Sequence, residues 1–193
     1  MKKSSGMTLI EMIIAIVLMG IAMVVFTSFL VPQIRDSAIP HYQTRAAALG
    51  QGFMSQILAR GFDENSDFDG GTVRCGENGV SCTDVNKLGA DTKLDGSLEI
   101  KPSDFNDVDD YIGCWSTSTT ASQCDGSPRG NISDVLGADS TEQYKNFRLE
   151  VNVAYDDLTD KAPDEITEYK KVTLRIFAGN TQHLTLTGIK GNY

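Results

Sequence analysis

The sequence has few residues that could support a catalytic triad or a zinc site. Only two histidines are present, His41 and His183, and neither has a local partner that indicates a triad. No phosphate-binding loop and no G-x-S-x-G motif occur. A zinc-thiolate site needs short paired cysteine spacings or nearby histidines, and the chain offers neither. We therefore expect a protein that is not an enzyme and has no cofactor and no metal-thiolate site.

Basic residues are scarce in the larger part of the chain. From residue 61 onward there are 24 acidic and 12 basic residues, which is a net charge of −12. Such a surface repels phosphate backbones and anionic lipid headgroups. We therefore expect this region alone not to bind nucleic acid.

Charge is missing altogether from residues 12–31, which read MIIAIVLMGIAMVVFTSFLV. A helix needs about 20 such residues to cross the hydrocarbon core of a membrane. Gly20 and the alanines at positions 15 and 22 provide small faces for close helix approach. The run predicts a membrane-spanning helix.

All four cysteines follow the apolar run, and an even number of cysteines in an exported domain indicates disulfides. Three connectivities can be drawn. We favour Cys75 with Cys82 and Cys114 with Cys124, because each pair closes a short loop at small entropic cost.

A second helical pattern follows Pro32 and Pro40, each of which is expected to end or kink a helix. Apolar residues recur every three or four positions and form one stripe, with Gly61 as a stop. The stripe, which should pack on a sheet, consists of Tyr42, Ala46, Leu49, Phe53 and Ile57.

Three later stretches alternate apolar and polar residues, as strands do: residues 147–155, 172–176 and 184–186. Their short connections predict an antiparallel meander, and Leu98 with Ile100 suggests a further short strand. Residues 61–146 are rich in turn residues and predict loops held by the cysteines. Trp115 is expected to pack on a disulfide.

Two acidic runs raise the question of calcium. Asp63, Asn65, Asp67 and Asp69 alternate before Gly70, similar to the start of an EF-hand loop, but Gly76 then stands where a bidentate Glu is required. The second run consists of Asp104, Asp107, Asp109 and Asp110. We interpret both runs as solvated loop acids, with calcium binding as the alternative.

The first eleven residues do not form a conventional secretory signal, which has its cleavage site beyond the apolar region. Lys2 and Lys3 are followed by Ser4-Ser5-Gly6-Met7-Thr8-Leu9-Ile10-Glu11. Glu11 lies at the edge of the apolar run, where a carboxylate without a partner is costly.

This segment resembles the class 3 signal of type IV prepilins, in which a basic leader ends in Gly and T-L-I-E opens the apolar helix. The resemblance implies that a prepilin peptidase cuts between Gly6 and Met7 on the cytoplasmic side and methylates the new amine. Met7 stands where the family usually has Phe. Glu11 would then be the fifth mature residue, able to pair with its own amine or with that of a neighbouring subunit and so set the register of assembly.

The expected fold is therefore α+β and type IV pilin-like, with a long N-terminal helix packed on an antiparallel β-meander beside a loop-rich, disulfide-bonded region. The expected parts are a leader (1–6), a transmembrane and filament-core helix (7–31), an amphipathic helix (32–60) and a globular head (61–193). Before assembly the chain would span the inner membrane once with its N-terminus in the cytoplasm. Afterwards it would lie in an extracellular pilus or a periplasmic pseudopilus.

The expected function is that of a structural minor pilin that is incorporated into, or primes, a type IV pilus. Its partners would be other pilin subunits and the prepilin peptidase. The stretch Phe62-Asp63-Glu64-Asn65-Ser66 followed by Arg74-Cys75 resembles MSHA-type (mannose-sensitive haemagglutinin) minor pilins, MshD-like. The alternatives are a pseudopilin of a type II secretion or DNA-uptake system and a tip adhesin with a ligand-binding head.

Overall fold

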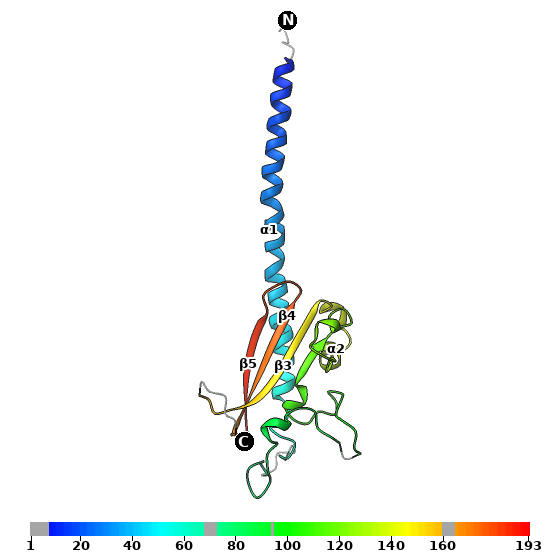
Figure 1. Cartoon of the computed structure of the whole chain (residues 1–193), viewed down its shortest axis with the longest axis vertical. Helices are drawn as coiled ribbons and strands as arrows, with labels where there is room; N and C mark the ends of the chain where they lie inside the picture. Colours follow the sequence, from blue (N-terminus) through cyan, green and yellow to red (C-terminus); the bar gives the residue numbers. More distant parts are fainter. Residues whose placement is uncertain (1–7, 68–72, 94, 160–164) are drawn as a thin grey trace. The chain divides into compact units, whose positions relative to one another are not determined.

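The computed structural model describes residues 8–67, 73–93, 95–159 and 165–193 (Figure 1). The chain divides into two compact units, Met1–His41 and Tyr42–Tyr193. One long helix, α1 (Leu9–Leu58), contributes to both units, and the second unit contains all the strands. This second unit is called the head below.

Helix α1 is not ended at Pro32 or Pro40, both of which lie inside it. A proline lacks one N–H donor, so each costs the helix one hydrogen bond, and the turns on either side retain theirs. The helix ends at Leu58, three residues before the predicted stop at Gly61.

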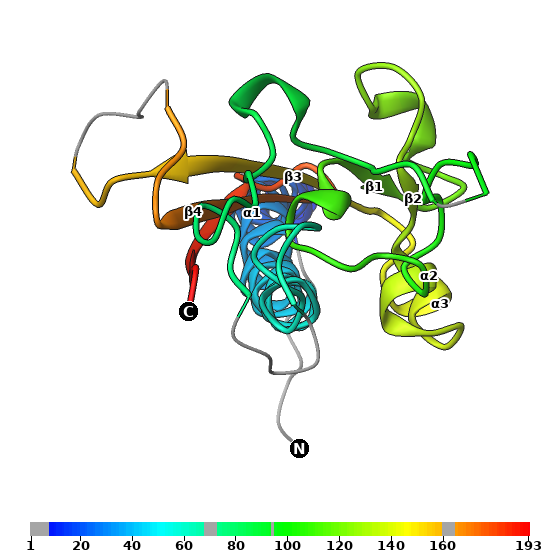
Figure 2. The ribbon, with the colours of Figure 1, turned by 90° about the horizontal axis from the view of Figure 1, so that it is seen from below.

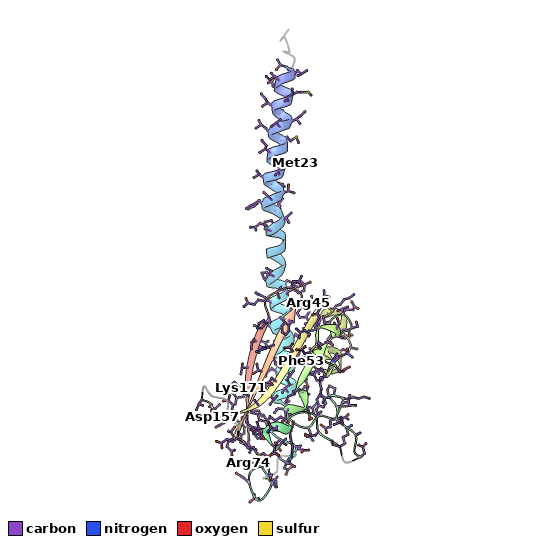
Figure 3. All side chains as sticks on the ribbon, in the orientation of Figure 1. Met23, Arg45, Phe53, Arg74, Asp157 and Lys171 are labelled. Carbon is purple, nitrogen blue, oxygen red and sulfur yellow. A yellow bond between two sulfur atoms is a disulfide. The ribbon has the colours of Figure 1, made fainter. Side chains whose placement is uncertain are left out.

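Residues Leu9–Gln33 of α1 are long and apolar enough to cross a membrane. Their mean hydropathy is 2.8 over the most apolar window, and none of that window is buried within the chain. In Figure 3, Met23 points away from the helix axis, and its side chain is 62% exposed. The segment includes the charge-free run and fits the predicted membrane-spanning helix.

The apolar stripe of α1 forms one side of the head core, as predicted. Ala46, Leu49, Phe53 and Ile57 are each at most 2% exposed, and Tyr42 packs at the edge of the same cluster. Figure 2 shows this part of α1 along one face of the sheet. Burying a side chain of this size contributes about 1.5–3 kcal/mol relative to leaving it in water.

The sheet has five strands in the order β2-β1-β3-β4-β5. Its three long strands, β3 (Phe147–Asp156), β4 (Tyr169–Ala178) and β5 (Leu184–Gly191), form the predicted antiparallel meander. Leu149 lies opposite Ile176 and Val151 opposite Leu174, which places the apolar positions on the face that α1 covers.

Two short strands complete the sheet, and the sequence did not indicate them. Strand β1 (Gly113–Ser116) pairs antiparallel with β3, and β2 (Gly130–Asn131) pairs parallel with β1. The predicted strand at Leu98 and Ile100 is wrong, because both side chains are exposed and only Leu98 makes an isolated bridge, with Thr92. An alternation of two apolar residues is too short to distinguish a strand from a loop.

Short helical turns connect these elements. They are η1 (Val85–Lys87), η2 (Asp109–Tyr111), η3 (Ala121–Gln123), α2 (Ile132–Leu136) and α3 (Ser140–Gln143). The described parts of residues 61–112 contain only η1, η2 and isolated bridges, as the predicted loop region of residues 61–146 requires. Residues 113–146 depart from that prediction, because they contain β1, β2, η3, α2 and α3.

Both short-loop disulfides are present, Cys75–Cys82 and Cys114–Cys124. Trp115 is fully buried, but it does not pack as predicted. Its ring lies against Phe53, Phe105 and Tyr111, and its indole N–H donates to the Tyr111 carbonyl at 2.9 Å. Successive side chains in a strand point to opposite faces, so the ring faces the core while Cys114 faces away.

Candidate functional site

The first turn of α1 carries Glu11, the residue expected to act in assembly. The predicted processing site, Gly6 and Met7, lies outside the described residues. The backbone N–H of Thr8 donates to Glu11 Oε2 at 3.4 Å, and the Thr8 carbonyl accepts from the N–H groups of Glu11 and Met12. This is the glutamate half of a capping box, and it also places a negative charge at the positive end of the helix.

This capping role was not predicted, although the spacing Thr8-x-x-Glu11 is the sequence pattern that indicates it. Glu11 is exposed, so the hydrogen bond from Thr8 leaves its carboxylate accessible to a second donor. One carboxylate can therefore cap its own helix and still accept a hydrogen bond from a cation.

The large apolar side chains of Leu9–Gln33 are exposed on every side of the helix. Such a continuous apolar surface is typical of a helix that contacts lipid or other helices. The most exposed members include Leu9, Ile10, Ile16, Val24, Phe26 and Phe29, each at least 66% exposed.

In the head, the interpretation of the acidic runs as solvated loop acids is wrong for four residues. Asp63, Asp107, Asp109 and Asp110 are all 0% exposed. Lys170, which is also fully buried, pairs with two of them, Asp63 and Asp109. Asp107 and Asp110 accept hydrogen bonds from backbone N–H groups instead. Asp69 of the first run lies outside the described residues.

Lys170 is placed in the core by the alternation of β4. Positions 170, 172, 174 and 176 share the buried face of that strand. The predicted strand began at Val172 and so did not include this lysine, although the same alternation extended by one step reaches position 170.

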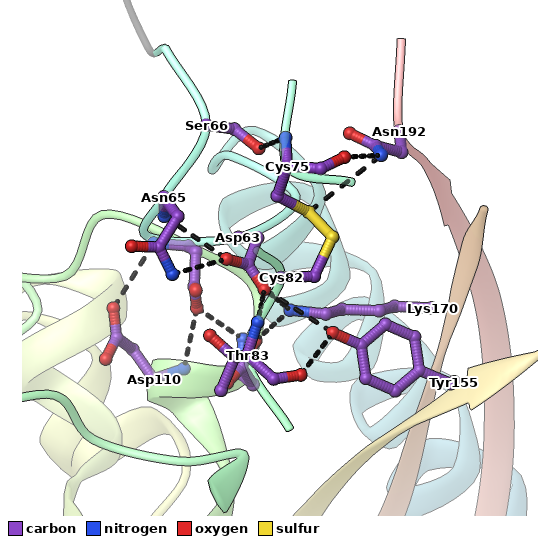
Figure 4. Close-up of polar contacts among 12 residues, drawn as sticks. Asp63, Asn65, Ser66, Cys75, Cys82, Thr83, Asp110, Tyr155, Lys170 and Asn192 are labelled. Atoms are coloured by element: carbon purple, nitrogen blue, oxygen red, sulfur yellow. Dashed lines mark hydrogen bonds and ion pairs between the residues drawn. A yellow bond between two sulfur atoms is a disulfide. The ribbon is translucent and has the colours of Figure 1, made fainter. Parts of the chain in front are cut away.

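The Lys170 ammonium lies 2.6 Å from Asp109 Oδ1 and 3.3 Å from Asp63 Oδ2 (Figure 4). It also lies 4.9 and 5.3 Å from the ring centroids of Phe62 and Tyr155, which favour a nearby cation. Burial alone would lower the pKa of Lys170, but the surrounding aspartates outweigh it and hold this pKa above the ordinary value.

Asp63 connects this ion pair to the loop that holds the first disulfide. Its carboxylate accepts hydrogen bonds from the backbone N–H groups of Asn65 at 3.2 Å and Thr83 at 2.9 Å. Burial acts to raise the pKa of Asp63, while the Lys170 charge and these hydrogen bonds lower it, and the net pKa lies below the ordinary value. The cluster therefore ties β4 to residues 63–83 through charge.

The fold also brings a carboxylate close to the first disulfide. Asp63, Cys75 and Cys82 have potential ligand atoms within 4.8 Å of one another, but both sulfurs belong to the disulfide. A disulfide sulfur is not the thiolate that binds a metal. These three residues therefore do not form a metal centre.

Comparison with known proteins identifies the N-terminal segment. Residues 1–27 match the model of the prokaryotic N-terminal methylation motif, which is the type IV prepilin signal. No curated protein and no solved structure matches the chain. The methylation motif, the apolar helix that it opens and the α+β head with two disulfides together indicate a type IV pilin-like protein, of a pilus or a pseudopilus.

Proposed function

We propose that this protein is a structural minor pilin that is incorporated into, or primes, a type IV pilus that serves attachment to surfaces. The observation that carries the proposal is the position of Glu11, a charged residue in the first turn of a helix whose next 20 residues carry no charge. In a simple membrane anchor this carboxylate could do no more than cap its own helix. In a stack of subunits it can select the register.

The selection follows from the cost of an unpaired charge. Cleavage before Met7 would create an amine four residues from Glu11, which is about one helical turn or 5–6 Å along the axis. Within one chain the carboxylate already accepts the Thr8 N–H. The amine of a neighbouring subunit can approach it from outside, and a register without this contact leaves a buried charge unpaired at a cost of several kcal/mol.

The partners of such a protein are the prepilin peptidase and other pilin subunits, and its first location is the inner membrane. A prepilin peptidase would process the chain at the cytoplasmic face of the inner membrane, where the helix spans the bilayer once. Other pilin subunits would then surround the apolar helix and replace the lipid. We further propose a filament of the MSHA type, on the resemblance noted in the sequence at residues 62–66 and 74–75 alone, because the matched family model covers only residues 1–27.

A pseudopilin is the second candidate, because the same signal and the same helix serve both assemblies. Immunogold labelling of cells and blotting of sheared filaments distinguish the two. A minor pilin is expected at low abundance in the sheared fraction together with the major subunit. Recovery only from the periplasm and inner membrane, in cells that carry normal pili, would contradict the pilus assignment and support a pseudopilus.

A further inference from the structure

Four carboxylates, two of them from the single turn at η2, lie close to the Lys170 ion pair. They belong to Asp91, Glu99, Asp107 and Asp110. One oxygen each of Asp91, Asp107 and Asp110 lies within 4.8 Å of the other two. Asp107 and Asp110 are 0% exposed and Glu99 is 6% exposed, so these charges are held away from bulk water.

The backbone fixes two of these side chains by one oxygen only. Asp107 Oδ1 accepts from the N–H groups of Asp109 and Asp110, at 2.9 and 3.3 Å. Asp110 Oδ2 accepts from the N–H groups of Asn106 and Asp107, at 2.9 and 3.2 Å. The two carboxylates are therefore oriented before any ligand binds.

The other oxygens of Asp107 and Asp110 have no such donors among the described residues. Within the described part of the chain, no hydrogen-bond donor reaches Asp107 Oδ2, Asp110 Oδ1, Asp91 Oδ2 or Glu99 Oε2. The same holds for the side-chain oxygen of Asn106, which adjoins this cluster in sequence. Leaving a buried acceptor without a partner costs about 1–3 kcal/mol, and more when it is charged. Five such oxygens in one region point to a missing cation.

Three cations near this cluster already have other partners. Lys93, which lines the adjacent pocket, pairs with Asp104 at 2.7 Å. Lys170 binds Asp63 and Asp109. The guanidinium of Arg129 donates to the backbone carbonyls of Asp110 and Glu99, at 3.0 and 2.7 Å, and attracts their carboxylates only from a distance. Burial raises the pKa values of Asp91 and Glu99 to about 7 and that of Asp107 to about 9. Repulsion from neighbouring carboxylates adds to the rise at all three, a hydrogen bond with Asp110 adds to it at Glu99, and the attraction of Lys170 partly offsets it at Asp107.

We propose that Asp91, Asp107 and Asp110 bind a calcium ion, with Glu99 and Asn106 as further oxygen donors. All the candidate ligands are oxygens, which hard cations prefer. They come from irregular loops, and Ca²⁺ accepts six to eight oxygens in flexible geometry, whereas Mg²⁺ requires a near-ideal octahedron. Asp91, Glu99 and Asn106 also line a pocket of about 510 Å³, through which the ion and its remaining waters can enter.

The ion would join the loop that carries Asp91 and Glu99 to η2. The ion pair of Lys170 with Asp109 already joins η2 to β4. Calcium sites of extracellular modules have dissociation constants on the order of 10⁻⁴–10⁻³ M, and we expect an affinity in that range. The site lies in the head, so its test is independent of the processing and assembly of the N-terminal segment.

The test uses the full chain in detergent, stripped with a chelator and then titrated with CaCl₂ or MgCl₂. Calcium at about 1 mM, within the range of such sites, is expected to raise the melting temperature, and magnesium to have a smaller effect. Isothermal titration calorimetry should show one calcium per chain. Unchanged melting and no heat of binding up to about 10 mM calcium, tenfold above that range, would overturn the proposal.

Variants identify the ligands. Asp91→Asn replaces a carboxylate whose Oδ2 has no hydrogen-bond partner within the residues described. The calcium-free protein should therefore still fold, while calcium binding should weaken about tenfold or more. Asp107→Asn retains the acceptor oxygen for Asp109 and should have the same effect.

Asp95→Asn is the matched control for these variants. Asp95 borders the same pocket, but its carboxylate accepts from Ser97, and its loss changes the net charge by the same amount. Binding as weak in Asp95→Asn as in Asp91→Asn would show general charge attraction, and wild-type binding in both Asp91→Asn and Asp107→Asn would show that the ion lies elsewhere. Either result would overturn the proposed site.

Discussion

Glu11 is the residue at which a local structural role and an assembly role meet. Its carboxylate accepts the Thr8 N–H, so a simple truncation removes a helix cap and a charge together. Glu11→Gln separates the two, because its amide oxygen can still accept that hydrogen bond while the charge is gone.

We expect Glu11→Gln and Glu11→Ala to be processed and inserted normally and to be equally defective in assembly. Loss of a charge pair worth several kcal/mol should lower incorporation into filaments by about tenfold or more. Blotting of sheared filaments against total membranes measures this. If Glu11→Gln assembles like the wild type while Glu11→Ala does not, capping and not charge is the function of Glu11.

Lys170 and Lys171 are adjacent lysines that both pair with aspartate but differ in burial. Lys170 is 0% exposed between Asp63 and Asp109, whereas the side chain of Lys171 is 42% exposed beside Asp156. Lys170→Met should lower the free energy of unfolding by about 3–5 kcal/mol, because it leaves buried carboxylates unpaired. Lys171→Met should change it by at most about 1 kcal/mol.

Trp115 is the single tryptophan and lies in the head core, so its fluorescence reports unfolding of the head in urea.

The effect of Lys170→Met should depend on pH in a defined direction. The lowered pKa of Asp63 means that its ion pair stabilises the head fully above the unfolded pKa of about 4 and is lost as pH falls through the folded value. The wild-type advantage should therefore shrink below about pH 4, and an advantage that grows there would contradict the ion-pair assignment.

At the scale of elements, the sequence predicted those parts whose apolar period repeats. The stripe from Ala46 to Ile57 and the alternation in β3 and β4 each involve several repeats, and all are present. Strand β5 is also present, although only two alternating leucines indicated it, as few as at the wrongly predicted strand of Leu98 and Ile100. Strands β1 and β2 are too short to show a period. The burial of Asp63 and Asp109 could not be recognised because it depends on pairing with Lys170, which is distant from both in the chain.

The two disulfides differ in how deeply they are buried. Cys75 is fully buried in an apolar cluster with Phe62 and Tyr155, and its carbonyl accepts from the side-chain amide of Asn192. The bridge Cys114–Cys124 instead closes a loop beside β1 that is partly exposed. The first bridge therefore supports the segment that carries Asp63.

Each short loop should contribute about 2–3 kcal/mol. Replacing Cys75 and Cys82 together by Ser should cost more than this, because it also leaves polar side chains in an apolar cluster, and the same double change at Cys114 and Cys124 should cost about this amount. Urea unfolding and limited proteolysis measure the order. Equal or reversed losses would show that burial does not distinguish the two bridges.

At the scale of the whole molecule, the chain joins an apolar helix that water does not tolerate to an acidic head built for an aqueous compartment. The most apolar window of Leu9–Gln33 is not buried by any other part of the chain that the structure describes. The head carries two disulfides, which form in an oxidising compartment. Only a membrane or a bundle of like helices can cover such a segment, which is the physical basis for the pilin-like assignment.

The prepilin signal makes a statement about the mature chain that one measurement tests. Intact-mass and N-terminal peptide analysis of the protein from membranes should find a chain that begins at Met7 with a methylated amine. Gly6→Leu should block the cut and leave the leader attached, because a peptidase cleft that accepts Gly has little room for a side chain. A mature chain that begins at Met7 is the predicted result, and an intact leader in the wild type, or a cut beyond residue 25, would contradict the account.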